Sequence, residues 1–179
     1  MSASLRRLIA PADPIYRLPL HDGWRRMPAD DPRLTARLPR EVGSLRGDSI
    51  TAILMPADRD APLTAPIIER QIRGEKFGTL DALVDEQIAA GASATLGDPA
   101  ILRHGVRETA GDVEGYVVRY LLATPGTGRR RGVEFIVAFP ALPDDKRQVL
   151  EALYDGIIVS GSWCVPNGNP LSPPEPSGG

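Results

Sequence analysis

The stretch with the clearest capacity for binding chemistry is glycine-rich and basic, with the sequence Gly126-Thr127-Gly128-Arg129-Arg130-Arg131-Gly132. It lacks the Lys-Ser/Thr ending and the following helix of a phosphate-binding P-loop, and it lacks the glycine spacing of a dinucleotide-binding turn. Guanidinium groups gathered on a loop can bind an acidic partner, an anion or a lipid head group. The alternative is that these arginines are solvated and keep one end of a sheet soluble.

A serine that precedes a hydrophobic run is a candidate nucleophile. Gly47-Asp48-Ser49-Ile50 is close to the nucleophile block of GDSL-type esterases. A serine nucleophile needs a histidine base that is held by an acid. The chain has two histidines, His21 and His104, and neither lies in the late Asp-x-x-His arrangement of that class. We therefore interpret Ser49 as a turn residue at the start of a strand and predict that the protein is not an enzyme.

Metal and redox chemistry lack the residues they require. The histidines form neither a His-x-x-x-His nor a Glu-x-x-His pair, so no zinc site is predicted. Cys164 is the single cysteine, which excludes an internal disulfide and indicates a packed or idle thiol. The acidic residues are scattered over expected helix faces and turns, which does not favour a catalytic carboxylate pair. We predict no metal and no cofactor.

Charge and hydropathy limit the partners and the location. The formal net charge is -2, whereas a nucleic-acid-binding domain usually has a basic face or a pI above about 9. Nucleic acid is therefore not predicted as a partner. The start of the chain has charges but no apolar run suited to a signal peptide, and no stretch is long enough to span a membrane. As written the chain is predicted to be cytoplasmic, with the cell envelope as the alternative if a native start has been replaced.

The second half of the chain predicts a β-hairpin followed by a helix. Runs rich in strand formers lie at Tyr116–Leu122 and Val133–Phe139 on either side of the basic loop. After Pro140 the apolar period changes from two residues to the spacing of a helix, with Pro143 suited to its first turn. The predicted apolar stripe of this helix consists of Val149, Leu150, Leu153 and Ile157. We expect this stripe to dock on the apolar face of the hairpin.

The first half predicts more strands and one more helix. The helix begins after Thr79 as N-cap and ends at Gly91. Strands are predicted at Ile15–Leu20, Arg33–Leu38, Ser49–Met55, Ala92–Leu96 and Ile101–Val106. The segment from Pro56 to Gly78 is predicted to be a long connection, with a short helix or strand at Ile67–Arg73. Connections of this length often carry binding residues.

These elements predict an α+β fold, an antiparallel β-sheet packed by helices in a single domain. The domain is predicted to span residues 15–164. Residues 1–14 are expected to form a loosely ordered arm, and residues 165–179, rich in proline and glycine, a disordered tail.

Two motifs resemble a known family. The segment from Asp144-Asp145-Lys146-Arg147 through Ile158-Val159-Ser160-Gly161-Ser162-Trp163, placed after a Val/Phe hairpin, resembles the closing element of the PsbP/Mog/DcrB-like fold superfamily. Leu18-Pro19-Leu20-His21-Asp22-Gly23-Trp24 is similar to the entry strand of its LpqN-like actinobacterial lipoprotein branch. The resemblance covers roughly residues 15–163 and implies a PsbP-like α/β/α sandwich with non-enzymatic work as adaptor, chaperone or assembly factor. The chain lacks the signal peptide and lipobox cysteine of those lipoproteins near its start.

Together these observations favour a non-catalytic protein-interaction adaptor, chaperone or assembly factor with a protein partner. The alternatives are a carrier of an apolar small molecule or lipid under the helix stripe, and third a hydrolase with a non-standard site. Trp24 follows a turn and is either a core residue or a ligand-stacking one. The candidate binding residues are Trp24, Ile67, Arg70, Arg73, Arg129, Arg130 and Arg131.

Overall fold

The structure, a computed structural model, describes residues 14–20, 24–28, 50–56, 65–73, 79–92, 94–96, 101–110, 113–128 and 130–166. Seven of the described strands form one antiparallel sheet in the order β2-β3-β4-β8-β7-β6-β5, and β1 pairs with β9 in a second small sheet. The strands are β1 (Ile15–Arg17), β2 (Trp24–Pro28), β3 (Ile50–Pro56), β4 (Ile67–Ile72), β5 (Ala94–Leu96), β6 (Ile101–Ala110), β7 (Val113–Ala123), β8 (Gly132–Pro140) and β9 (Ser162–Cys164). The helices are α3 (Leu80–Ala89) and α4 (Asp144–Val159).

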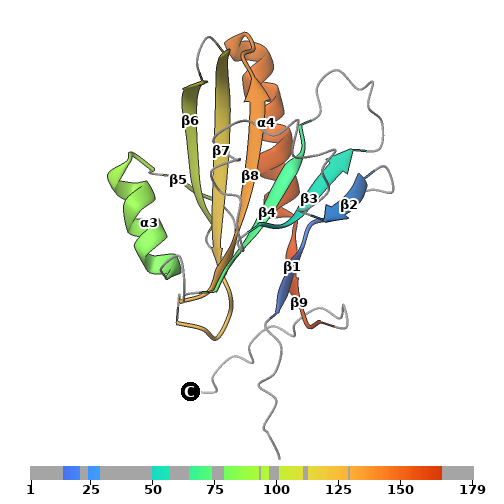
Figure 1. Ribbon diagram of the computed structural model, residues 1–179, viewed down its shortest axis with the longest axis vertical. Coiled ribbons are helices and arrows are strands. Elements are labelled where there is room, and N and C mark those ends of the chain that lie inside the picture. Colours follow the sequence, from blue (N-terminus) through green and yellow to red (C-terminus); the bar gives the residue numbers. More distant parts are fainter. Residues whose placement is uncertain are drawn as a thin grey trace, which may run out of the picture.

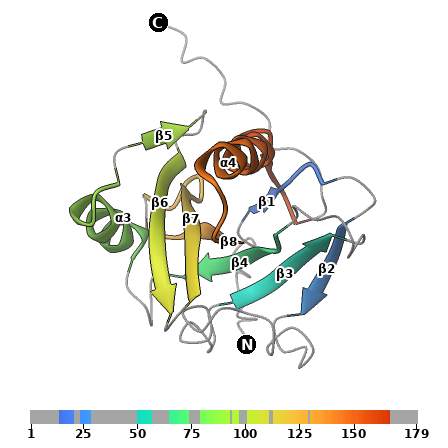
Figure 2. The same ribbon diagram turned by 90° about the horizontal axis from the view of Figure 1, so that it is seen from above.

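The two helices cover opposite faces of the sheet. The sheet curls around α4, which lies over its concave face, and α3 lies beside β5 and β6 (Figures 1 and 2). Leu80 of α3 packs with Ile72 and Leu121, whose neighbours along their strands, Gln71 and Tyr120, are on the α4 side. The predicted α+β class, with an antiparallel sheet packed by helices, is therefore confirmed.

The β7–β8 hairpin forms as its sequence predicts. Val133, Phe135, Val137 and Phe139 alternate along β8 and are all buried in the main core beneath α4. Thr124 and Arg131 close the loop with a backbone hydrogen bond of 2.9 Å. Gly126 and Gly128 in the loop have φ of 76° and 58°, which residues with a Cβ rarely adopt. The hairpin is thus the central, locally specified part of the sheet.

The buried face of α4 agrees with the predicted stripe only in part, because Leu150 is buried and Ile157 packs against the main core. Leu150, Tyr154 and Ile158 pack on the sheet, whereas Val149 and Leu153 are 67% and 52% exposed. Both sets recur at intervals of four residues, so helical period alone does not distinguish them. The set that contains the large aromatic ring has more apolar area to remove from water, and it occupies the core.

The elements that precede the β7–β8 hairpin agree with the prediction in part. Thr79 Oγ1 caps α3 by accepting a hydrogen bond from the N–H of Ala82, and Gly91 follows the helix with φ of 106°. The segment predicted as a connection with a short helix or strand contains β4, which lies between β3 and β8 inside the sheet. The sequence analysis did not predict β2 and β9. The strand predicted at Arg33–Leu38 and the tail beyond Pro166 lie outside the described residues.

Two buried tyrosines of the core tie distant segments to α4. The hydroxyl of Tyr154 accepts a hydrogen bond from the N–H of Ala65 and donates one to its carbonyl, each 2.7 Å long. The hydroxyl of Tyr16 on β1 donates to the carbonyl of Ile158, also at 2.7 Å. The Tyr16 ring packs edge-on against Trp163 of β9 at 5.2 Å. These contacts fix the small β1–β9 sheet and the entry to β4 against the end of α4.

We predict that the protein loses stability in alkali above about pH 10, the ordinary pKa of tyrosine. Burial raises the pKa of Tyr16 to about 12. The folded state therefore resists the ionisation that the unfolded chain undergoes, so this stability is full below about pH 10 and is lost as the pH rises toward 12. The loss is about 1.4 kcal/mol per pH unit in that window for one such tyrosine.

Urea unfolding at a series of pH values tests this expectation. The free energy of unfolding should fall as the pH rises above about 10, because burial raises the pKa of Tyr120 and Tyr154 as well. The Tyr16→Phe variant should be less stable at neutral pH but show a shallower alkaline decline. An unchanged decline in that variant would mean that Tyr16 does not contribute.

Candidate functional site

A network of charged and polar side chains joins α4 to β6 and β7. Asp155 accepts hydrogen bonds from Arg103 Nε at 2.9 Å and from the Tyr120 hydroxyl at 2.6 Å. Glu151 forms ion pairs of 2.8 Å with both Arg103 and Arg147. Each carboxylate therefore has partners from more than one element, as buried charges require.

The electrostatics of this network favour a structural role. Burial, followed by the hydrogen bond with Asp155, raises the pKa of Tyr120 above its ordinary value. Burial, followed by the hydrogen bond with Glu151, also raises the pKa of Tyr116. A general acid or base works best with a pKa near the operating pH. The pKa of each tyrosine is shifted further from neutral pH, so both hydroxyls remain protonated at neutral pH.

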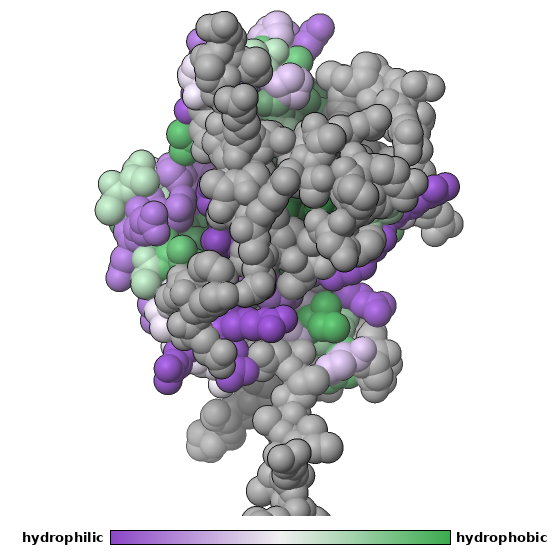
Figure 3. Space-filling model, in the orientation of Figure 1, coloured by the Kyte–Doolittle hydropathy of each residue, from purple (hydrophilic) through white to green (hydrophobic). Residues whose placement is uncertain are grey.

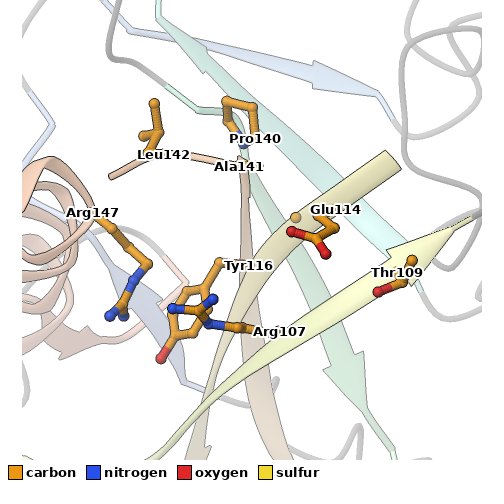
Figure 4. A pocket seen from close by; sticks show the side chains of 9 residues that line it. Arg107, Thr109, Glu114, Tyr116, Pro140, Ala141, Leu142 and Arg147 are labelled. Atoms are coloured by element: carbon orange, nitrogen blue, oxygen red, sulfur yellow. The ribbon is translucent and has the colours of Figure 1, made fainter. Parts of the chain in front are cut away.

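A cleft of about 220 Å³ opens beyond the first turn of α4, and we call it the helix-end cleft. Its lining comes from β6, β7, the β8–α4 loop and α4, and consists of Arg107, Thr109, Glu114, Gly115, Tyr116, Pro140, Ala141, Leu142 and Arg147 (Figure 4). The guanidinium of Arg147 lies over the Tyr116 ring, 4.5 Å from its centre. The Tyr116 hydroxyl lies above Gly105, where a Cβ would collide with it. Glycine at this position lets the ring lie flat on the sheet.

The predicted basic loop forms the opposite end of the same hairpin. Arg130 and Arg131 are exposed in the β7–β8 loop, and Arg73 is exposed directly after β4. We call these three residues the basic end. The carbonyl of Arg130 accepts a hydrogen bond from the N–H of Leu80, which anchors the loop to the start of α3. In the view of Figure 3, hydrophilic residues gather at this end of the sheet, below α3.

Two of these arginines share a second cleft, of about 330 Å³, which we call the tip cleft. Its lining is Pro14, Ile15, Gln71, Ile72, Arg73, Thr124 and Arg131, with no acidic residue among these. Ile72 pairs with Gly132 in the sheet, so Arg73 and Arg131 occupy the next opposite positions beyond that pair. Two cationic side chains therefore line one cleft.

The structure places the predicted binding residues in different environments. Arg73, Arg130 and Arg131 are exposed together, as the interpretation of the loop requires. Trp24 is half-buried and packs against the main core, which fits its interpretation as a core residue. Arg129 lies outside the described residues.

Two predicted binding residues are buried, which does not fit a place on a binding surface. Ile67 is fully buried in the core and Arg70 is only 7% exposed. Both belong to β4, which pairs with strands on both sides. A connection on the surface would expose such side chains. In a central strand, successive side chains instead lie on opposite faces of the sheet.

The candidate nucleophiles and metal ligands are not assembled into a site within the described residues. Nδ1 of His104 on β6 lies 2.6 Å from Oε1 of Gln87 on α3, so this histidine joins a helix to the sheet. Cys164 is buried and its thiol contacts Ser162. Ser49 and His21 lie outside the described residues. No group of three or more metal-ligating side chains occurs in the part of the chain that the structure describes.

The sequence analysis missed the helix-end cleft. Arg107 and Tyr116 pair on the β6–β7 hairpin, and Arg147 is far from both in the chain and meets them only because the hairpin extends past the start of α4. One available signal was the alternation of Arg103, Gly105 and Arg107 on one face of β6 opposite the aromatic residues of β7.

Comparison with known proteins identifies the fold. No family model matches the sequence, and no curated protein matches it. The solved structure of LpqN, described as involved in cell envelope biogenesis of Mycobacterium tuberculosis, superposes with a TM-score of 0.51. The similarity covers 88% of this chain and 87% of LpqN at 16% sequence identity. No helix among the described residues is long and apolar enough to cross a membrane. The chain has an LpqN-like fold, as its entry and closing motifs indicate.

Proposed function

We propose that the protein is a non-catalytic adaptor that binds an acidic segment of a partner protein at its basic end. The observation that carries the proposal is that Arg73 and Arg131 both line the tip cleft. Arginine binds carboxylates through a planar fork of donors, and Gln71 and Thr124 add polar groups to the same lining. A partner segment rich in glutamate or aspartate matches this chemistry.

The arrangement of charge also supports a protein rather than a nucleic acid. The chain carries a net charge of -2, and its exposed arginines in the tip cleft form a local patch rather than a basic face. A local patch of one sign steers a complementary partner and sets its orientation. The chaperone and assembly-factor variants of this proposal use the same surface and differ only in what happens to the partner afterwards.

A carrier function has less support. The carrier hypothesis needs an apolar cavity under Val149, Leu153 and Ile157. Val149 and Leu153 face away from the sheet, while Leu150, Tyr154 and Ile158 are packed into the core beneath the helix. The described clefts at the two ends of the sheet have linings that mix charged, polar and apolar residues, and neither lies under this stripe.

A titration with a defined probe tests the adaptor proposal. We expect a short, fluorescently labelled glutamate-rich peptide to bind the full chain, with an affinity that falls as salt is added. The variant Arg73→Glu with Arg131→Glu should weaken binding at least about fivefold, because two attractive contacts become repulsive. Since both residues are exposed, its unfolding midpoint should stay near that of the parent protein.

The matched control is Arg25→Glu with Lys146→Glu, which makes the same change in net charge at exposed positions outside the tip cleft. It should alter the affinity by less than about twofold if binding is local. Equal losses in both variants would indicate non-specific attraction, and no loss in either would exclude the basic end. If the charge reversal impairs folding, Arg73→Gln with Arg131→Gln makes the same test with smaller perturbation.

Native mass spectrometry of the protein isolated from its own host identifies the partner. A co-purifying polypeptide of defined stoichiometry that is absent with the Arg73→Glu and Arg131→Glu variant would support the adaptor. A bound mass of a few hundred daltons that is lost on denaturation would contradict it and favour a carrier. Fractionation of the same cells addresses location, because the similarity to LpqN supports the envelope alternative.

A further inference from the structure

The helix-end cleft contains two guanidinium groups that converge on one carboxylate oxygen. Oδ1 of Asp144 lies 2.9 Å from Nη2 of Arg107 and 3.4 Å from Nη2 of Arg147. Arg107 comes from β6, while Asp144 and Arg147 belong to the first turn of α4. The chain therefore contains a geometry in which a carboxylate is held between two arginines.

Asp144 occupies this position only weakly. The side chains of Arg107 and Asp144 are 71% and 64% exposed, and exposed ion pairs contribute little to stability. Arg147 is held more firmly, because it also pairs with Glu151 and lies over the Tyr116 ring. A carboxylate from outside can thus replace Asp144 between the exposed Arg107 and the preorganised Arg147 without disturbing the core.

The other residues that line the helix-end cleft limit the chemistry and the size of a ligand. Glu114 and Arg147 approach the cleft from opposite sides, with Tyr116 and Arg107 along its floor and Leu142 above (Figure 4). A ligand whose carboxylate meets the arginines presents its other end to Glu114 and Thr109, which accept hydrogen bonds. The volume of 220 Å³ is smaller than the range of about 300–1,000 Å³ for drug-sized ligands.

We infer that the helix-end cleft binds a carboxylate that carries an amine or amide donor, the chemistry shared by a free α-amino acid and the C-terminus of a peptide. The carboxylate replaces Asp144 between Arg107 and Arg147, and the donor pairs with Glu114. This site lies at the other end of β7 from the tip cleft, about 27 Å away at the rise of a strand. It is independent of the proposed adaptor surface.

Calorimetric or NMR titration of the full chain tests the inference with three probes: leucine, N-acetyl-alanyl-leucine and the C-terminal amide of that dipeptide. We expect saturable binding in the millimolar range for at least one of the two carboxylates and none for the amide. Binding of leucine alone identifies an amino-acid site, and binding of the acetylated dipeptide identifies a peptide C-terminus. Saturable binding of the amide would overturn the inference. The inference would also be overturned if none of the three probes bound to either the parent protein or the Asp144→Asn variant.

Variants separate the site from general charge effects. Asp144→Asn removes the internal competitor and should tighten carboxylate binding about 1.5- to fivefold, a shift of the size expected for one exposed ion pair. Asp145→Asn is the matched control, since this exposed residue is in the same helical turn and has the same charge; it should change nothing. Arg107→Gln should abolish measurable binding while the protein stays folded, because Arg107 is exposed.

A last variant tests the donor end of the ligand. Glu114→Gln should weaken the binding of leucine more than the binding of the acetylated dipeptide. Leucine carries a charged ammonium, whereas the acetylated dipeptide carries a neutral amide. Equal tightening by Asp144→Asn and Asp145→Asn would show that only overall charge matters and would overturn the site.

Discussion

Replacement of Glu134 by leucine is expected to lower the free energy of unfolding by about 3–5 kcal/mol, the cost of leaving a buried charge without its partner. Glu134 on β8 is 1% exposed, and it lies directly opposite Arg70 on β4, with which it forms an ion pair. Arg119 on β7 pairs with its other oxygen at 3.2 Å. Without the carboxylate, Arg70 stays charged and buried in the face of the sheet that is opposite α4.

A double-mutant cycle isolates the pair. Arg70→Met combined with Glu134→Leu removes both charges and should recover most of the loss, because apolar residues of similar size often replace a buried ion pair at little cost. Urea unfolding curves give the free energies for the parent protein, both single variants and the double variant. A loss below about 1 kcal/mol for Glu134→Leu would mean that water reaches Arg70 and that the pair behaves as a surface pair.

Replacement of Tyr154 by phenylalanine is the second large expected effect, a loss of about 2–4 kcal/mol in the free energy of unfolding. The change keeps the ring but leaves both the N–H and the carbonyl of buried Ala65 without the hydroxyl. An unsatisfied buried donor or acceptor costs about 1–3 kcal/mol. Ala65 directly precedes the central strand β4, so the variant should also loosen the entry to that strand.

Tyr16→Phe is the graded comparison for this prediction. Its hydroxyl makes one hydrogen bond, to the carbonyl of Ile158, so its loss should be smaller, about 1–2 kcal/mol. Thermal or urea unfolding ranks the two variants, and amide hydrogen exchange at Ile67 and Ile68 reports the entry to β4. If Tyr154→Phe is no more harmful than Tyr16→Phe, the double hydrogen bond does not hold this entry in place.

The two predictions concern opposite faces of one sheet. Glu134 and Arg70 lie on the α3 side, whereas Tyr154 belongs to α4 on the other side. Because the sites share no contact, their losses should add when the variants are combined. Neither substitution touches the tip cleft or the helix-end cleft, so variants that remain folded should retain their binding properties.

The sequence by itself determined the elements whose signals are local. The alternation in Val133–Phe139, the glycines of the basic loop, the Thr79 cap and the start of α4 after Pro143 all correspond to the structure. Each depends on period, turn chemistry or capping within a few residues of chain. The motifs at the two ends of the domain were also sufficient to predict the LpqN-like fold.

Only the tertiary structure decided which of two equally periodic stripes of α4 is buried, and that Ile67 and Arg70 belong to a central strand. It also brought Arg73 to Arg131 and Arg107 to Arg147, residues separated widely in sequence. These outcomes depend on the order of strands and on competition for buried area among distant segments. A local pattern carries no information about either, because the free energy that selects them arises from contacts between elements.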